Sequence, residues 1–333
     1  MVNKVNKLIY LIISSNIFKH LLLFYFLLFG VSSLGFSQNR KDTIQAGVYL
    51  KSLYDFNSST FSYDVDLWMW FKYTNDSLNP LKTIEIANAK KYDFSNQSIE
   101  KRDSKFWATQ NCKATINQNW SLKNYPFDHQ KLEVVIEESE MDSRKLFLAA
   151  SQNKFEYNDQ IDIKGWKIDS TQIKNGVSHY KTDFGDPSLN GESDYSKVFY
   201  TIYLSRNSTS LFFKLFTGCY VAFLVAFLVF FIKPIYVDPR FGLSIGGLFA
   251  AVGNKYVADS NMPESISFTL VDSIHDITFV FILLTIVCSI ISLKIYDSIH
   301  SNKHALFDKI AAAILMAAYI ITNVIMILSA ARH

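Results

Sequence analysis

The sequence is poor in cysteine and in net charge. Its 333 residues include three cysteines and carry a formal net charge of +3. Only Cys112 lies in the region expected to be soluble, because Cys219 and Cys288 fall in apolar runs. This distribution excludes a disulfide framework within the soluble region. The near-neutral charge argues against a nucleic-acid-binding surface, so no nucleic-acid partner is expected.

Sequence signatures of an enzyme are also missing. His129 and His179 have no nucleophile pattern nearby, no Cys/His cluster has metal-ligand spacing, and no glycine-rich phosphate loop joins a strand to a helix. Four acidic residues between 137 and 142 could bind a cation or an amine, but such a run is usually a solvated loop. We therefore expect no enzymatic activity, no metal and no cofactor.

The N-terminal segment predicts export. Residues 1–38 begin with Lys4 and Lys7, continue through an apolar run at 21–29, and end in small and polar residues, as a secretory signal peptide does. The domain that follows is then extracytoplasmic, and the protein is expected in the plasma (inner) membrane. A further apolar run at 8–13 makes the segment long, so an uncleaved anchor remains an alternative.

Residues 39–206 predict an antiparallel β-sandwich. In residues 61–73, alternate side chains from Phe61 to Tyr73 point to the presumed core, and Trp68 and Trp70 point the other way. Further strands are expected at 83–87, 106–116, 131–137, 161–169, 178–184 and 197–204, with turns at 175–176 and 185–188. The two tryptophans could line a binding site, cover a subunit interface or pack on the surface.

Residues 207–333 predict four membrane spans, at about 211–232, 241–257, 277–293 and 310–331, each near the roughly 20 residues that cross a bilayer. The expected fold class is therefore an extracellular β-sandwich followed by an α-helical four-span transmembrane domain. Lys233, Lys294 and Lys303 fall in loops at one end of the spans, and Asp259 and Asp272 fall at the other. The positive-inside tendency then places the β-sandwich outside the cytoplasm.

The second expected span, within residues 238–263, is rich in glycine and in polar groups. On a helical period, Phe241, Ile245, Leu248 and Val252 share one face, which is expected to pack, and a nearly bare face carries three glycines and Phe249. Small residues fit close helix packing and a pore lining equally well. The pore is favoured by three polar residues near the end of this segment, Asn254, Lys255 and Asp259, although a Lys255–Asp259 pair could account for two of them.

One loop and one arginine resemble those of a known receptor family. The loop Tyr125-Pro126-Phe127-Asp128-His129-Gln130 is similar to the aromatic-Pro-Phe-Asp-x-Gln motif of the pentameric ligand-gated ion channels, also called Cys-loop or Pro-loop receptors. Arg206 matches the basic residue that precedes their first span. The resemblance covers residues 43–331. Gln118 and Leu132 stand where animal members have the disulfide cysteines, which is similar to the prokaryotic branch.

The resemblance implies a homopentamer in a lipid bilayer, opened by an agonist that is a small molecule, a proton or a cation. The second span would line the pore with Asp238, Gly242, Gly246, Phe249, Gly253 and Val257. The agonist pocket would use Trp68, Trp70, Tyr180, Phe184 and Tyr195. Binding would be coupled to opening by Tyr125, Pro126, Phe127, Asp128, Arg206 and Pro263.

Two mechanistic expectations follow from this resemblance. Phe249 would form a hydrophobic gate, because the glycine-rich face offers no other bulky side chain in the middle of the pore. Asp238, at the inner mouth of the pore, would favour cations.

No Trp-x-Pro segment occurs near residues 79–88 and no tryptophan lies near Ser139, which argues against an aromatic cage for a quaternary amine. A non-conducting receptor of the same fold remains the main alternative, and an enzyme is a distant third.

Overall fold

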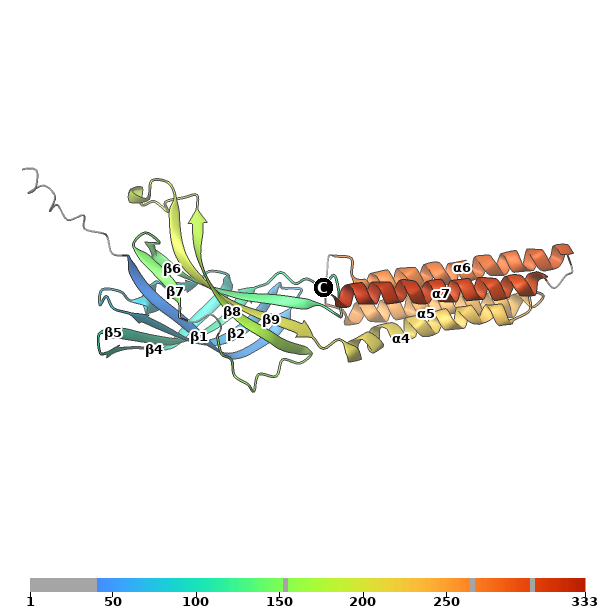
Figure 1. Ribbon diagram of the computed structural model, residues 1–333, viewed down its shortest axis with the longest axis horizontal. Helices are drawn as coiled ribbons and strands as arrows, with labels where there is room; N and C mark the ends of the chain where they lie inside the picture. The colour runs from blue at the N-terminus through green and yellow to red at the C-terminus, as the bar shows by residue number, and fades with distance from the viewer. Residues whose placement is uncertain (1–40, 152–154, 264–266, 300–302, 333) are drawn as a thin grey trace, which may run out of the picture. The chain divides into compact units, whose positions relative to one another are not determined.

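The computed structural model of the chain describes residues 41–151, 155–263, 267–299 and 303–332. The predicted signal peptide, residues 1–38, lies outside the described residues. Within them the chain forms nine strands, β1 to β9, followed by four long helices, α4 to α7, which run side by side (Figure 1).

The nine described strands form two sheets. The five-stranded sheet has the order β4-β5-β2-β1-β7 and contains β1 (Asp42–Asn57), β2 (Ser62–Tyr73), β4 (Ala89–Arg102), β5 (Lys105–Asn117) and β7 (Leu146–Ala150). The four-stranded sheet has the order β3-β6-β9-β8 and contains β3 (Ile84–Ile86), β6 (His129–Asp142), β8 (Trp166–Tyr180) and β9 (Ser193–Arg206). Two short helical turns, α3 (Pro80–Thr83) and η2 (Pro187–Leu189), lie in the connections.

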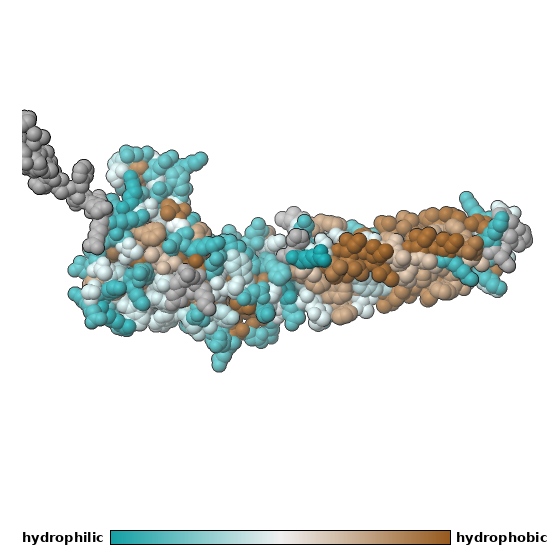
Figure 2. All heavy atoms as spheres, viewed as in Figure 1, coloured by the Kyte–Doolittle hydropathy of each residue, from teal (hydrophilic) through white to brown (hydrophobic). Residues whose placement is uncertain are grey.

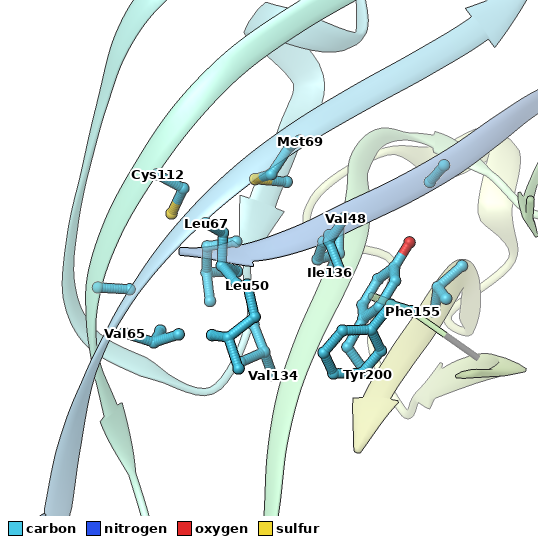
Figure 3. Close-up of a cluster of buried hydrophobic side chains, with 14 of the residues drawn as sticks. Val48, Leu50, Val65, Leu67, Met69, Cys112, Val134, Ile136, Phe155 and Tyr200 are labelled. Atoms are coloured by element: carbon cyan, nitrogen blue, oxygen red, sulfur yellow. The ribbon is translucent and has the colours of Figure 1, made fainter. Parts of the chain in front are cut away.

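The two sheets enclose one hydrophobic core, to which both contribute buried side chains (Figure 3). The five-stranded sheet supplies Val48, Val65, Leu67, Met69 and Cys112, and the four-stranded sheet supplies Val134, Ile136 and Tyr200. Burial raises the pKa of the Cys112 thiol to about 12, so this free cysteine behaves as a core residue.

The alternating pattern of residues 61–73 correctly predicts which side chains of β2 are buried. Every second residue from Tyr63 to Tyr73 is at most 3% exposed, and only Phe61, which precedes the strand, is exposed. The predicted turn at Asn175-Gly176 is wrong, because both residues lie inside β8 and pair with Val198 and Lys197 of β9. The strands β1, β4 and β7 were not predicted.

The acidic run in β6 is not a solvated loop. Glu137 and Glu138 are 2% and 1% exposed, and each carboxylate has hydrogen-bond donors. Thr83 Oγ1 donates to Glu138 Oε2 over 2.7 Å, and the Tyr180 hydroxyl donates to Glu137 Oε1 over 2.7 Å. Burial raises the pKa of Glu138, and the hydrogen bond from Thr83 opposes the rise. Glu137, Glu138 and Asp142 are therefore buried in the sheet and Glu140 is exposed, a distinction that a charge pattern alone cannot reveal.

The prediction of four membrane spans is wrong. Three helices of the described chain are long and apolar enough to cross a membrane, namely Thr209–Phe231, Leu270–Ser298 and Lys303–Ala331. They correspond to α4 (Thr209–Phe227) with the turn η3 (Leu228–Phe231), to α6 (Leu270–Ile299) and to α7 (Lys303–Ala331). The remaining long helix, α5 (Val237–Asn261), is not apolar enough, because glycines and charged residues interrupt it. Three such helices are compatible with a membrane protein.

The four helices share an interior. One cluster joins Ala222 and Phe223 of α4, Ala251 of α5, Ile282 of α6 and Tyr319 of α7. The rings of Phe223 and Tyr319 stack with their centroids 3.8 Å apart. Many side chains on the outside of the bundle are also apolar, as the brown surface over the helices shows (Figure 2). Side chains of this kind suit contact with lipid or with other copies of the chain.

Candidate functional site

The first candidate region is the exposed face of α5. All six residues predicted to line a pore are exposed in the single chain: Asp238, Gly242, Gly246, Phe249, Gly253 and Val257. A Cβ atom placed on any of the three glycines would meet no atom within 4 Å, so these glycines serve no close packing inside the subunit. The Phe249 ring is 70% exposed.

The exposed face also holds bulky side chains that the sequence interpretation missed. Tyr256 is 77% exposed and lies seven residues after Phe249, which places it on the same side of the helix two turns away. Ile245 and Val252, expected on the packing face, are 45% and 50% exposed. Within one subunit the expectation is therefore wrong for Ile245 and Val252, whereas Phe241 and Leu248 are half-buried. Phe249 is not the only bulky residue on the exposed face of α5.

The packing face of α5 consists mostly of small residues. Ser244, Gly247, Ala251 and Ala258 are buried, together with Arg240. A Cβ atom on Gly247 would lie 2.7 Å from the carbonyl oxygen of Ala222 on α4, so only glycine permits this approach. Small residues thus bring α5 against α4, and the opposite side of α5 remains uncovered.

The neighbouring glycines 246 and 247 should respond differently to the same substitution. Gly247→Ala is expected to destabilise the subunit by about 1–3 kcal/mol through overpacking against α4. Gly246→Ala meets open space, and alanine favours the helix by up to about 1 kcal/mol over glycine. Thermal unfolding of both variants in detergent tests this difference, and equal melting temperatures would contradict the assigned packing face.

The polar residues near the end of α5 do not mark the exposed face. The Asn254 side-chain amide donates to the carbonyl oxygen of Leu215 on α4 over 2.9 Å and lies 2.9 Å from Nε2 of the buried His275 on α6. The Lys255 ammonium donates to Asp259 and, over 2.7 Å, to Asp272 on α6. These groups tie α5 to its neighbours, so Asn254 and Lys255 are no argument for a pore.

Arg240 links the other end of α5 to the bundle. Its guanidinium is 1% exposed, lies 2.7 Å from Asp308 Oδ2 of α7, and donates to Ser292 Oγ of α6 over 3.1 Å. Its Nε also donates to the carbonyl oxygen of Val229 in η3 over 3.2 Å. A buried charge requires such partners. Arg240 therefore holds the helix in place and cannot line the entrance of a pore. Asp238, by contrast, is exposed.

The second candidate region joins the Tyr125–Gln130 loop to the end of β9. Arg206 Nε donates to Asp128 Oδ1 over 2.5 Å, and its terminal nitrogen donates to Oδ2 over 3.0 Å. The Asp128 side chain is 1% exposed and that of Arg206 is 14% exposed. The guanidinium also lies over the rings of Trp166, 4.0 Å from the centroid, and of Tyr125. The predicted coupling pair is thus a buried, bidentate ion pair stacked on aromatic rings.

The same loop reaches the helices. Gln130 donates to Asp128 Oδ2 over 2.9 Å, Tyr125 and Pro126 are buried, and the Phe127 ring lies 5.8 Å from that of Phe212 on α4. The Leu270 amide, which begins α6, donates to the carbonyl oxygen of Lys123 over 2.9 Å. These contacts lead to α4 and α6. Tyr125 also shares a buried cluster with Ala258 near the end of α5, and Met262 in the loop after α5 packs against that cluster. Pro263 in that loop is half-buried, and residues 264–266 lie outside the described part.

The third candidate region is an open groove on the outer face of the five-stranded sheet, here named the tryptophan groove. It has a volume of about 580 Å³. Its aromatic residues are Trp68, Trp70, Phe106 and Trp107, and its basic residues are Lys72, Arg102 and Lys105. A Cβ atom on Gly47 of β1 would lie 2.3 Å from the Trp70 indole, so glycine at that position lets the ring lie flat on the sheet.

The other predicted pocket residues form a separate aromatic cluster beside the four-stranded sheet. The ring centroids of Tyr180, Phe184 and Tyr195 lie 5.3, 5.9 and 6.1 Å apart. Burial and the bond to Glu137 raise the pKa of Tyr180, and its hydroxyl stays a donor to that carboxylate. Phe184 is 63% exposed. None of these three side chains lines the tryptophan groove, so a single chain does not assemble the predicted pocket.

Comparisons with known proteins do not identify a family: no family model matches the sequence, and no curated protein matches it.

Proposed function

We propose that the chain is a subunit of a homopentameric ligand-gated ion channel, in which the exposed face of α5 surrounds a central pore. The observation that carries the proposal is that the least apolar of the four long helices has an uncovered face of glycines and Phe249. A helix enclosed by protein on one side and water on the other has no need of the apolar surface that lipid requires. The three apolar helices would then face lipid.

The same proposal explains why the predicted pocket residues are separated within one chain. In a ring of identical subunits, the tryptophan groove of one copy would face the Tyr180 cluster of the next, and an agonist would bind between them. The bilayer orientation expected from the lysine distribution places the sheets outside the cytoplasm. The Asp128–Arg206 pair would then transmit binding to α4 and α6, provided that the agonist prefers the open arrangement.

Current through purified protein in planar bilayers tests this function. We expect a pentamer by native mass measurement and stimulus-dependent single-channel steps under a salt gradient. A confirmed pentamer that never conducts, over a range of candidate ligands and pH values, would contradict the channel and favour a non-conducting receptor. Turnover of a substrate by the protein would instead favour an enzyme.

Neutralising Asp238 is expected to reduce cation selectivity. Asp238 is exposed at the start of α5, where five copies would form an acidic ring at one mouth of the pore. For a tenfold salt gradient, a pore permeable only to a monovalent cation has a reversal potential of about 59 mV, and the wild type should approach this value. Asp238→Asn should move the reversal potential toward zero. Asp297→Asn is the control, because this exposed acid lies near the end of α6. An unchanged reversal potential in Asp238→Asn would remove the assignment.

A further inference from the structure

The tryptophan groove combines aromatic walls with an excess of positive charge. Of its seven lining residues, four are aromatic, three are basic and none is acidic. The volume of about 580 Å³ falls within the range of small-molecule sites. Aromatic faces alone attract cations, but three fixed positive charges around the same opening oppose a cationic ligand. The charge of the groove therefore favours an anion.

The strand register places the basic side chains next to one another. Lys72 of β2 lies directly opposite Trp107 of β5, and Lys105 of β5 lies directly opposite Arg102 of β4. The Arg102 guanidinium stacks on the Trp107 ring, 3.6 Å from its centroid. Stacking fixes the plane of the guanidinium, whose donors match the two oxygens of a carboxylate.

The positive charges of the groove are only partly balanced inside the subunit. Arg102 donates to Glu100 over 2.8 Å, in a pair whose side chains are 57% and 54% exposed. Within the described ranges, Lys72 and Lys105 form no ion pair with a carboxylate. A pair as exposed as Arg102–Glu100 is weak, so a ligand carboxylate can compete with Glu100 for the guanidinium.

We propose that the tryptophan groove binds a small organic anion, whose carboxylate contacts Arg102 and Lys72 and whose planar apolar part lies against Trp68 and Trp70. The claim that this anion is the agonist rests on the proposed channel function. Binding to the groove itself depends only on residues of one subunit. The ligand class and the channel function can therefore be tested separately.

Three probes of similar size and different charge test the ligand class: benzoate, benzyl alcohol and benzylamine. Their binding to the full-length protein in detergent is measured by tryptophan fluorescence, and the same probes are applied in the bilayer recordings. Benzoate should bind the wild type most tightly. Arg102→Gln and Lys72→Gln should each weaken benzoate about tenfold, the loss of one charge-assisted contact of about 1.4 kcal/mol, and leave benzyl alcohol unchanged.

Lys174→Gln is the matched control, because Lys174 is an exposed strand lysine on β8 of the other sheet. Two substitutions in the groove are used so that the test still works if one variant misfolds, and an unchanged melting temperature confirms that each variant is folded.

Tighter binding of benzylamine than of benzoate would overturn the proposal, and so would benzoate binding that is insensitive to both substitutions. Charge-dependent benzoate binding without current would support the anion site and count against the channel. Currents evoked by benzylamine alone would support the channel and overturn the anion site.

Discussion

Replacing Phe249 with alanine is expected to produce a resting current in the absence of agonist. The ring is 70% exposed in the single subunit and lies between glycines whose Cβ positions are open. In a closed pentamer the five rings would bury one another and exclude water. Burial of a phenylalanine side chain stabilises by about 1.5–3 kcal/mol. If each of the five subunits loses part of this burial energy, the total loss approaches roughly 5.5 kcal/mol. A change of that size converts a 1:99 ratio of open to closed channels into about 99:1.

The control for this substitution is Phe213→Ala. Phe213 is 62% exposed but lies on α4, so its removal changes the same side chain on an outer helix. Current at rest in Phe249→Ala and not in Phe213→Ala would support the gate. Tyr256→Ala tests the other gate candidate, because Tyr256 lies on the same face of α5 as Phe249. A leak in Tyr256→Ala with a silent Phe249→Ala would contradict the assignment of Phe249.

Position in a sheet does not decide which strands the sequence reveals, because the edge strand β3 is expected at residues 83–87 while the central strand β1 is missed. Residues 61–73 reveal β2 because alternate side chains enter a core shared by both sheets. By contrast, β4 has almost no buried side chain and is held by backbone pairing with β5, so its composition carries no period of two. Asn175-Gly176 has the composition of a turn, yet its backbone pairs with β9, and this partner is unknown from the local sequence.

A similar limit applies to the candidate site on α5. Helical periodicity places Gly242, Gly246 and Phe249 on one face, and these residues are indeed exposed. Periodicity does not show which neighbour covers each of the other faces. The packing face was therefore assigned to Ile245 and Val252, although the close contact with α4 is made at Gly247. Asn254 had the appearance of a pore residue because its acceptor, the Leu215 carbonyl, lies 39 residues away.

Removing one partner of the Asp128–Arg206 pair is expected to separate ligand binding from channel opening. Asp128 is almost fully buried, and loss of its partner leaves an uncompensated charge that costs about 3–5 kcal/mol. The pair lies within the contact between the Tyr125–Gln130 loop and the helices α4 and α6. Asp128→Asn and Arg206→Gln should therefore lower the stability of the protein and abolish ligand-evoked current.

A double-mutant cycle distinguishes this pair from two independent residues. We expect an interaction energy of at least about 1 kcal/mol between Asp128→Asn and Arg206→Gln in the unfolding free energy. The control is Lys131–Glu133, a nearby ion pair whose side chains are 55% and 33% exposed. Such an exposed pair should give about 0–1 kcal/mol. An interaction energy no larger than that of the control would reject the Asp128–Arg206 pair as an energetic unit.

The conservative variant Arg206→Lys separates a loss of coupling from a loss of folding. Lysine keeps the positive charge but cannot reproduce the two parallel hydrogen bonds to Asp128 or the flat stacking on Trp166. We expect Arg206→Lys to remain a folded pentamer that binds ligand with unchanged affinity and opens less often. If it gates like the wild type, charge alone suffices at this position. If it loses ligand binding together with current, the arginine supports the fold and does not transmit the signal.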